Sequence, residues 1–473
     1  MGHAPRMFSL RVSGGLVYTD GLLLARDILV SGEKIADLVR SGQPAAAERV
    51  LRADGRLVLP AMIDMHVHAR DPGYTYKEDY RSMSEAAAAG GVSMVVDMPN
   101  VEPPTLSPED LQDKQAIASA RSIVDVAHWC SGVNEDQIEP LAAAGAAGFK
   151  IVQLSGEYPR DPRLSCNDDG RLLRLFRRIA ATGLPCVVHP FNQRLYDQLV
   201  ADLRAEGVPP DWRALSRVYT TSAIWDSAVA SLLALQELTG VRLHVAHLHS
   251  AHAIEMVRRA KQEGRAVTAE IDPKYYTLSL DDLERLHGRA CPAGYVASDE
   301  ARMAAIREAL LDGTIDNVSS DHAPHTAEEI KLLEGDAFLA AAGLPMLDVT
   351  FMLVLDDYVS GLLPIQRVVE LVASAPAAIL GIADRKGRLA VGMDADLVVV
   401  DTSSPHVIRD SDVRSKVGWT PYDGRVVGAR IEACVRRGEI IARDRQVVSD
   451  ATTGQEVLDP RPALRAKALE PTT

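Results

Sequence analysis

Strand-like and helix-like segments alternate regularly through the middle of this 473-residue chain. Between about residues 57 and 386, short apolar runs are each followed by a segment rich in Ala, Leu, Glu and Arg, as in a parallel sheet built from strand–helix units. Eight such units predict an α/β protein, a closed (β/α)8 or TIM barrel. The eight expected strands span residues 57–66, 92–98, 122–128, 147–152, 185–189, 242–247, 266–271 and 316–321.

The two ends of the chain have a different sequence pattern from the barrel region. Both contain short alternating strands broken by glycines, without a long helical period. We therefore expect the ends to build one small β-sandwich domain together. The expected boundaries are 1–56 and 387–455 for that domain, 57–386 for the barrel and 456–473 for a flexible tail. Residues 1–6 need not be native, since Met7 could equally be the start.

Charge and cysteine usage narrow the classes of partner. The 51 basic and 65 acidic residues leave a net charge of −14, which disfavours nucleic acid and anionic membranes and favours small molecules. The five cysteines are odd in number and form no Cys-x-x-Cys pair, as expected for reduced thiols in a cytoplasmic protein. An uninterrupted apolar segment of about 18 residues is not evident, so no membrane span is expected.

Polar residues that can bind metals stand at the ends of the expected strands. In such a barrel the chemistry lies at the carboxyl ends of the strands, so these residues should face one site. The first strand ends in His66 and His68, which point to the same side when the chain is extended. In chain order, the residues are His66 and His68, Asn100, His128, Lys150, His189, His247, Glu270 with Asp272, and Asp321.

Four of these histidines, one aspartate and one lysine are a suitable ligand set for two divalent metals, since imidazole and carboxylate suit zinc. Lys150 fits only if it is carbamylated, because dications repel an ammonium; a surface or phosphate-binding lysine is the alternative. His189 and His247, taken singly, could be structural histidines, and Asp321 could cap the following helix. As a ligand, Asp321 could also accept the proton of a metal-activated water.

Longer stretches around these residues resemble the amidohydrolase superfamily, specifically its cyclic-amide branch of dihydroorotases, allantoinases and hydantoinases. The resemblance covers nearly the whole chain, and its motifs together are highly specific. The matching stretches are residues 64–73, 77–79, 86–91, 97–100, 148–150, 310–316, 320–326 and 392–397.

This resemblance implies an enzyme with two Zn²⁺ ions per chain. A hydroxide bridging the metals would attack an amide carbonyl that zinc polarises, and Asp321 would shuttle the proton. Relatives of this kind form dimers or tetramers, so a homo-oligomer is expected. An inactive dihydroorotase-like scaffold is the alternative from another class; it predicts missing ligands, and none is missing. The implied ligands are His66, His68, carbamylated Lys150, His189, His247 and Asp321.

The choice of ring depends on residues beyond the metal ligands. In dihydroorotases, the positions matching Arg70, Asn100 and His325 hold the substrate carboxylate, and all three residues are present. A guanidinium fork, an amide and an imidazole form a sensible anion site. The expected activity is therefore hydrolysis of dihydroorotate to N-carbamoyl-aspartate, although Arg70 could instead form a loop salt bridge.

An allantoinase, a hydantoinase or dihydropyrimidinase, and another lactam or imide hydrolase stay open as alternatives. Allantoinases usually carry asparagine where Arg70 stands. Hydantoinases place a tyrosine shortly after the bridging lysine, where this chain has Ser155, with Tyr158 as the nearest tyrosine. Residues 189–192 and 220–226 depart from the dihydroorotase pattern, and their aromatic and apolar character would suit a larger or less polar ring.

Overall fold

The predicted barrel is present in the computed structural model, which describes residues 7–154, 162–331, 333, 335–340, 343–449 and 452–458. Within these ranges, eight parallel strands pair in the order in which they occur in the chain. Each overlaps one expected strand, so the (β/α)8 fold is confirmed. The strands are β7 (Met62–Val67), β8 (Val92–Asp97), β9 (Asp125–Ser131), β10 (Gly148–Val152), β11 (Pro185–His189), β12 (Arg242–Val245), β13 (Val267–Ile271) and β14 (Asn317–Val318).

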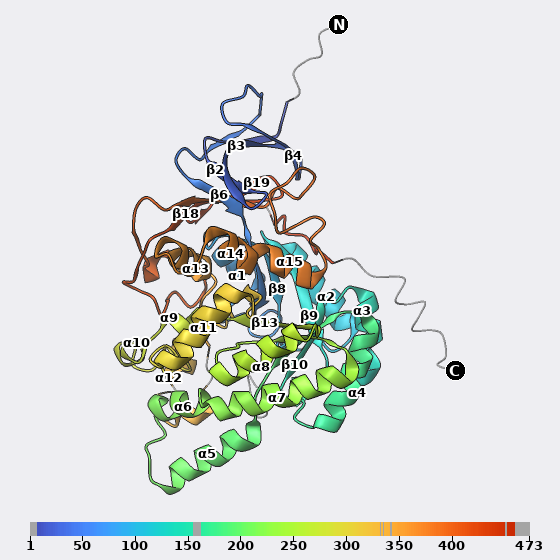
Figure 1. The fold of residues 1–473 in the computed structure, drawn as a ribbon, viewed down its shortest axis with the longest axis vertical. Coiled ribbons are helices and arrows are strands. Elements are labelled where there is room, and N and C mark those ends of the chain that lie inside the picture. The colour runs from blue at the N-terminus through green and yellow to red at the C-terminus, as the bar shows by residue number, and fades with distance from the viewer. Residues whose placement is uncertain are drawn as a thin grey trace, which may run out of the picture.

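Helices surround the barrel, and several begin at recognisable capping residues (Figure 1). Asp79 accepts a hydrogen bond from the N–H of Ser82, and Ser107 is followed by Pro108 in the first turn of its helix. The helices are α1 (Tyr80–Ala89), α2 (Pro108–Arg121), α3 (Ile138–Ala144), α4 (Asp169–Thr182), α5 (Gln193–Ala205), α6 (Trp212–Tyr219), α7 (Ser222–Thr239), α8 (Ala251–Gln262), α9 (Lys274–Thr277), α10 (Leu280–Arg285), α11 (Glu300–Asp312), α12 (Ala327–Lys331), α13 (Thr350–Val359), α14 (Ile365–Val369) and α15 (Ala375–Leu380), with a π-helical turn, η5 (Glu370–Ser374), between the last two.

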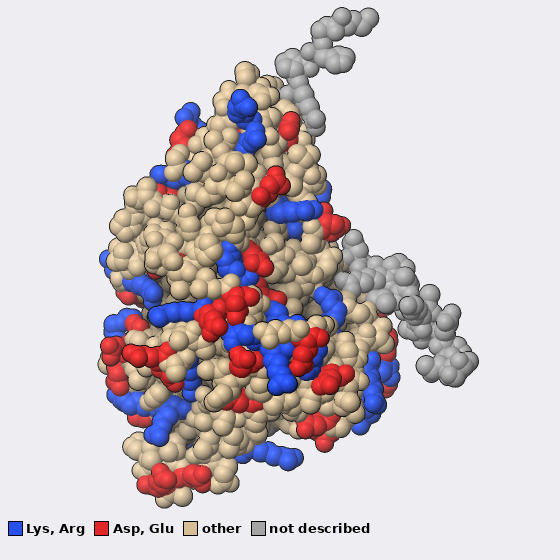
Figure 2. All heavy atoms as spheres, viewed as in Figure 1, with Lys and Arg blue, Asp and Glu red and all other residues tan. Residues whose placement is uncertain are grey.

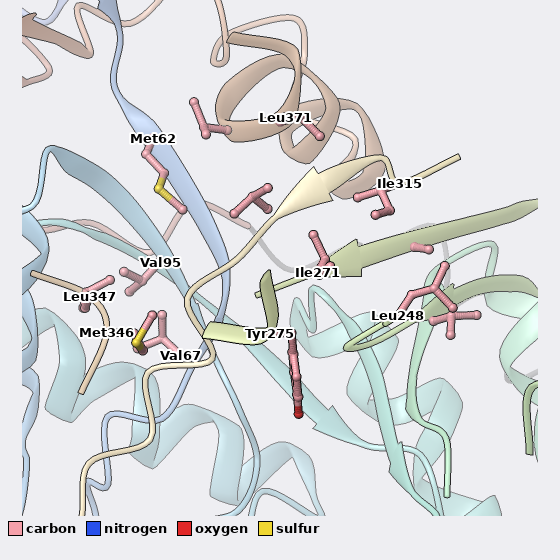
Figure 3. Packing of buried hydrophobic residues seen from close by; sticks show 14 of the residues in the cluster. Met62, Val67, Val95, Leu248, Ile271, Tyr275, Ile315, Met346, Leu347 and Leu371 are labelled. Atoms are coloured by element: carbon pink, nitrogen blue, oxygen red, sulfur yellow. The ribbon is translucent and has the colours of Figure 1, made fainter. Parts of the chain in front are cut away.

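Side chains alternate between the two faces of the barrel wall. On β8, Val95 belongs to the large core between strands and helices, and Val96 belongs to a separate core inside the barrel. Figure 3 shows part of the outer core, with Met62 of β7 and Val95 of β8. Phe149 on β10 also packs outward, so the next side chain, Lys150, points to the interior.

The barrel closes between β14 and β7 through few backbone contacts. Among the described residues, one isolated parallel bridge joins Val67 to His322 across this seam. The N–H of His68 donates to the carbonyl of His322 at 2.9 Å. The buried carboxylate of Asp64 accepts from the N–H of Ser320 at 3.2 and 3.3 Å. A side chain therefore supplies part of the closure that backbone pairing supplies elsewhere.

Strands from both ends of the chain form a second sheet beside the barrel, as Figure 1 shows. One part of β3 pairs with β2 and another with β1 and β4, so the sheet folds over a shared core that includes Val17, Ile28 and Val399. The predicted β domain from both chain ends is confirmed. Its strands are β1 (Leu10–Ser13), β2 (Leu16–Thr19), β3 (Leu22–Ser31), β4 (Lys34–Arg40), β5 (Val50–Arg52), β6 (Leu57–Pro60), β15 (Leu397–Asp401), β18 (Arg430–Arg436), β19 (Glu439–Arg443) and β20 (Gln446–Val447), and β16 (His406–Val407) pairs separately with β17 (Val426–Val427).

The expected strand over residues 57–66 is two strands that belong to different sheets. β6 pairs with β2 and β15 of the end domain, whereas β7 is the first barrel strand. Both strands are buried along their whole length, so the apolar pattern continues across the break at Ala61. Hydrophobic periodicity could not reveal this division, because strands buried on both faces read as one continuous run.

The last described segment, residues 452–458, lies against the N-terminal end of barrel strand β9. The N–H of Val126 donates to the carbonyl of Gln455, and the N–H of Val457 donates to the carbonyl of Val126, both at 3.0 Å. Val457 and Leu458 are buried in the interior core. The expected flexible tail over 456–473 therefore starts too early, because so short an extended segment has no periodic signal. Residues 459–473 lie outside the described part of the chain.

We expect Val457→Asp to destabilise the barrel. Placing a carboxylate in this apolar core should cost on the order of 3 kcal/mol of unfolding free energy. The midpoint of thermal unfolding, followed by circular dichroism, should fall by several degrees. Thr452→Asp, at an exposed position of the same segment, is the matched control. Equal midpoints for the two variants would contradict the packing of Val457.

Among the described residues, one apolar stretch, Trp212–Thr239, has the length and hydropathy that a membrane span would need. It consists of α6 and α7, which are separated at Thr220 and Thr221. In the most apolar window, 56% of the residues are buried inside the protein. α7 packs against α4 and α8, so this hydropathy reflects packing within the helical layer.

Acidic and basic side chains are interspersed on the face that Figure 2 shows. Neighbouring helices pair opposite charges across their surfaces. Arg258 of α8, for example, donates to Asp312 of α11 at 2.8 Å. Exposed pairs of this kind contribute little to stability, so the surface charge does not explain the fold.

Candidate metal centre and substrate cavity

The six predicted metal ligands surround one cavity at the carboxyl ends of the barrel strands. Two of the three predicted substrate-binding residues, Arg70 and Asn100, line the same cavity. The third, His325, lies behind Arg70. The cavity is lined by His66, His68, Arg70, Asn100, Lys150, His189, His247 and Asp321, all predicted from the sequence, and also by Val152, Leu154, Leu164, Tyr219, Lys274 and Tyr275, among others.

His66 and His68 of the first barrel strand present equivalent nitrogens to the same carboxylate. Their Nε2 atoms each lie 3.3 Å from Oδ1 of Asp321. Each opposite nitrogen has another partner, since Nδ1 of His66 is 2.5 Å from Glu270 and Nδ1 of His68 is 2.7 Å from Oδ1 of Asn100. These partners fix the ring orientations, so both Nε2 atoms are aimed into the cavity.

His247 and His189 complete the group of imidazoles. Nδ1 of His247 lies 2.9 Å from Oδ2 of Asp272, and Nε2 of His189 lies 3.4 Å from the hydroxyl of Tyr219. The ring centroid of His247 is 4.7 Å from that of His66 and 4.9 Å from that of His189. Four histidines from three strands and their following loops therefore converge on one point.

Lys150 stands among these imidazoles with its amine buried. Its Nζ has no hydrogen-bond partner among the described residues. Burial lowers the pKa of Lys150, against the attraction of Glu270, Asp321 and Asp272, which favours the charged form. A buried amine without a partner beside imidazoles and carboxylates fits a lysine that takes up CO₂ to become an oxygen ligand.

The donor atoms fall into groups of the size that a metal ion needs. Those of His66, His68 and Asp321 lie within 4.8 Å of one another, and those of His247, Asp272 and Asp321 form another such group. Because Asp321 belongs to both groups, the residues fit two adjacent divalent ions. Nitrogen and carboxylate donors of this kind are the ones that zinc prefers.

Burial disfavours the charged form of three of the four histidines, which suits metal ligands because these must be uncharged. Burial lowers the pKa of His68 to about 3. Burial also lowers the pKa of His66, and it holds the pKa of His189 well below its ordinary value. The rings therefore offer free lone pairs to a cation.

Three residues of the cavity wall adopt left-handed backbone conformations. The φ angles are 61° at Arg70, 56° at His247 and 44° at Asp321. Such angles are uncommon for residues other than glycine and cost free energy at each position. The three residues follow barrel strands, where this turn of the backbone aims each side chain at the cavity.

Lys274 lies at the beginning of α9 and joins two carboxylates of the site. Its Nζ donates to Oδ2 of Asp272 at 2.9 Å and to Oδ2 of Asp321 at 2.6 Å. Burial opposes the charged form, but the two carboxylates prevail and raise the pKa of Lys274. A cation therefore lies at the edge of the metal-binding group.

Arg70 is only 1% exposed and has unsatisfied donors. Its Nη2 lies 3.4 Å from Nε2 of His325, while its Nε and Nη1 have no hydrogen-bond partner among the described residues. Behind it, Nζ of Lys77 donates to Glu329 at 2.7 Å and lies 3.3 Å from Nδ1 of His325. Burial lowers the pKa of His325 to about 4, so this ring is neutral and supports Arg70 from behind.

Phe191 and Trp225, from the two stretches that depart from the dihydroorotase pattern, form a cluster with Tyr219 beside the cavity. Ring centroids of Phe191 lie 5.2 Å from Tyr219 and 5.7 Å from Trp225, whose Nε1 donates to the carbonyl of Tyr219 at 2.7 Å. Of these three residues, Tyr219 lines the cavity. The cluster therefore contributes one side chain, the phenol of Tyr219, to the cavity lining. Ser155 and Tyr158 lie outside the described residues.

Glu270, Asp272 and Lys274 complete the site but had no role in the sequence-based ligand set. Glu270 and Asp272 follow the pattern of polar strand ends, which was the available signal. Their partners on other strands, His66 and His247, are remote in sequence. Lys274 follows a proline after the strand and carries no signal of its own.

The barrel with metal-binding side chains at its carboxyl end is matched by a known family. Residues 57–156 and 223–439 match the sequence pattern of the amidohydrolase family. The chain therefore belongs to the amidohydrolase family, and its relatives place it in the cyclic-amide branch.

Individual relatives align over nearly the full chain. It is 32% identical to an L-hydantoinase of Paenarthrobacter aurescens over 449 residues, which are 93% of this chain and 96% of the relative. It is 31% identical to an allantoinase of Escherichia coli strain K12 over 459 residues, 95% of this chain and 99% of the relative. The solved L-hydantoinase (dihydropyrimidinase) from Arthrobacter aurescens is similar with a TM-score of 0.90 at 30% identity, covering 96% of this chain and 100% of that one.

Proposed function

We propose that this protein is a metal-dependent hydrolase that opens the ring of a cyclic ureide of the hydantoin or allantoin type. The proposal rests on near full-length similarity to proteins named hydantoinase and allantoinase. These relatives favour the alternative of the sequence analysis over the expected hydrolysis of dihydroorotate. The observation that carries the proposal is the convergence of all six expected ligands on one cavity.

The positions of the side chains support a role for each residue in this reaction. His66, His68, His189, His247, Asp321 and a carbamylated Lys150 would hold two zinc ions, which when bound polarise the scissile carbonyl and make water nucleophilic at neutral pH. Asp321 lines the same cavity as the histidines and contacts His66 and His68. Its carboxylate would accept a proton from the attacking water and return it to the ring nitrogen as the C–N bond breaks.

The cavity also selects the substituent on the ring. Two donors of Arg70 are buried without a partner, which is costly unless a ligand accepts from them. A carboxylate matches the guanidinium in charge and geometry. Asn100 presents its amide from the same wall, since its Oδ1 is taken by His68. We therefore infer that a ring with an anionic substituent is preferred.

Arg70→Ala should discriminate between substrates. Loss of a charge-assisted pair is expected to lower kcat/KM about 100-fold for a hydantoin with a carboxylate-bearing substituent, but less than about threefold for unsubstituted hydantoin. The measurement is steady-state hydrolysis of both compounds. Arg121→Ala, whose guanidinium pairs with Asp71 away from the cavity lining, is the matched control. Equal losses on both hydantoins would refute the assignment of Arg70.

The proposed function is tested with the zinc-loaded, bicarbonate-treated protein on a panel of cyclic amides. The panel contains hydantoin, 5-substituted hydantoins with neutral and carboxylate side chains, allantoin, dihydrouracil and dihydroorotate. Ring opening of a hydantoin or of allantoin, detected as the ring-opened product, is the expected result. Exclusive turnover of dihydroorotate, or no turnover with both metals bound, would reject the proposal.

A further inference from the structure

Lys274 is a cation in the wall of the cavity that neither metal binding nor recognition of the ring explains. Its side chain is 2% exposed, and it lines the same cavity as the histidines. The next residue, Tyr275, stacks on His249 with ring centroids 4.3 Å apart and an interplanar angle of 7°. This stacking fixes the short helix α9, and so it fixes the position from which Lys274 reaches into the site.

The two bonds of Lys274 connect carboxylates that follow two neighbouring barrel strands, β13 and β14. Asp272, which accepts one of them, also accepts from Nδ1 of His247 through the same Oδ2 atom. Asp321, which accepts the other, uses Oδ2 for Lys274 and turns Oδ1 toward the histidines of β7. The ammonium therefore holds one defined carboxylate oxygen of Asp321, Oδ2, and leaves Oδ1 to face His66 and His68.

Stability alone does not account for this arrangement. Burying a lysine and two aspartates removes three charges from water, and apolar residues of similar size often stabilise a protein as well or better. A second buried lysine, Lys386, pairs with three carboxylates, those of Asp125, Asp394 and Asp396, at the other end of the barrel, near the C-terminal segment. Lys274 differs from it in lining the cavity.

We propose that Lys274 is a positioning residue for Asp321. By holding Oδ2, it prevents rotation of the carboxylate and directs Oδ1 to the metal side, where the proton of the attacking water must be accepted. This inference rests on the proposed ring hydrolysis. It adds a residue whose role is carried out through Asp321 and predicts an effect on the rate of the chemical step rather than on substrate binding.

The first test compares Lys274→Met with Lys386→Met. Methionine keeps most of the length of the side chain but removes the charge. A loosened catalytic group is expected to lower kcat about 100-fold, with KM changed less than about threefold and the metal content unchanged. Lys386→Met should lower the thermal midpoint and leave kcat of the folded protein unchanged. Wild-type kcat in metal-loaded Lys274→Met would overturn the inference.

A second variant separates positioning from folding. Lys274→Ala leaves a space that opens to the cavity, where propylammonium can replace the missing ammonium. We expect propylammonium to raise kcat of this variant at least about tenfold, whereas 1-propanol should not, because the bond to Asp321 requires a charged donor. Equal effects of the amine and the alcohol would contradict a positioning role.

Failure of the proposed function can be told apart from failure of this inference. If the wild-type protein opens no ring of the panel, the function is rejected, and Lys274 is then tested in the cobalt-loaded protein. The visible absorption of bound Co²⁺ should change in Lys274→Met, because the orientation of a carboxylate ligand changes, and should stay the same in Lys386→Met. An unchanged spectrum in Lys274→Met would reject the inference.

Discussion

Asp321→Asn is expected to abolish ring opening while the metal content stays close to that of the wild-type protein. The amide keeps an oxygen that can face His66 and His68 but cannot accept a proton from water. Removal of a general base should lower kcat by at least about 1000-fold. Turnover and metal content are measured on the same preparation, by product formation and by elemental analysis.

A nearby aspartate provides the control for this prediction. Asp316 pairs with Lys261 at 2.8 Å and is outside the cavity lining. Asp316→Asn should therefore leave kcat unchanged. If Asp321→Asn retained more than about a tenth of the wild-type kcat, a different residue would have to move the proton.

Lys150→Met is expected to remove both metal binding and activity. Methionine preserves the apolar stem of this inward-facing side chain but cannot form a carbamate, so one proposed ligand of the cavity lining is lost. Fewer than two metals per chain and background turnover are the expected results. Metal content is again measured by elemental analysis, and intact mass spectrometry of the wild-type protein should show the added mass of one CO₂.

Lys150→Arg separates charge from ligand chemistry. Arginine keeps a cation at this position and cannot be carbamylated, so it should repel the metals as well as fail to bind them. Two metals bound to either variant, with turnover at the wild-type level, would show that Lys150 is not a ligand.

The barrel could be predicted because its strands are short apolar runs separated by helical segments. The same property concealed its beginning. β6 and β7 are both fully buried, so no change of period marks the point where the chain passes from one sheet to the other. The packing of Val457 was equally invisible, because a segment of a few residues has too little sequence to show alternation.

The ligand set was accessible for a different reason. Each of its residues lies near the carboxyl end of a barrel strand, and parallel strands in a barrel bring these ends together. The supporting residues Glu270 and Asp272 could be suspected from the same position, but their partners are fixed by the barrel geometry. Lys274 lies on a separate short helix, and its contact with Asp321 depends on the tertiary arrangement alone.

The sparse pairing between β14 and β7 has a consequence for the relation between ligand binding and folding. His66 and His68 belong to one side of this seam, and Asp321 belongs to the other. A metal ion bound by all three residues would link β7 to the segment after β14, across the most sparsely paired seam of the barrel. Metal binding and closure of the barrel would then be thermodynamically linked. Removal of the metals by a chelator should therefore loosen the protein first between β14 and β7.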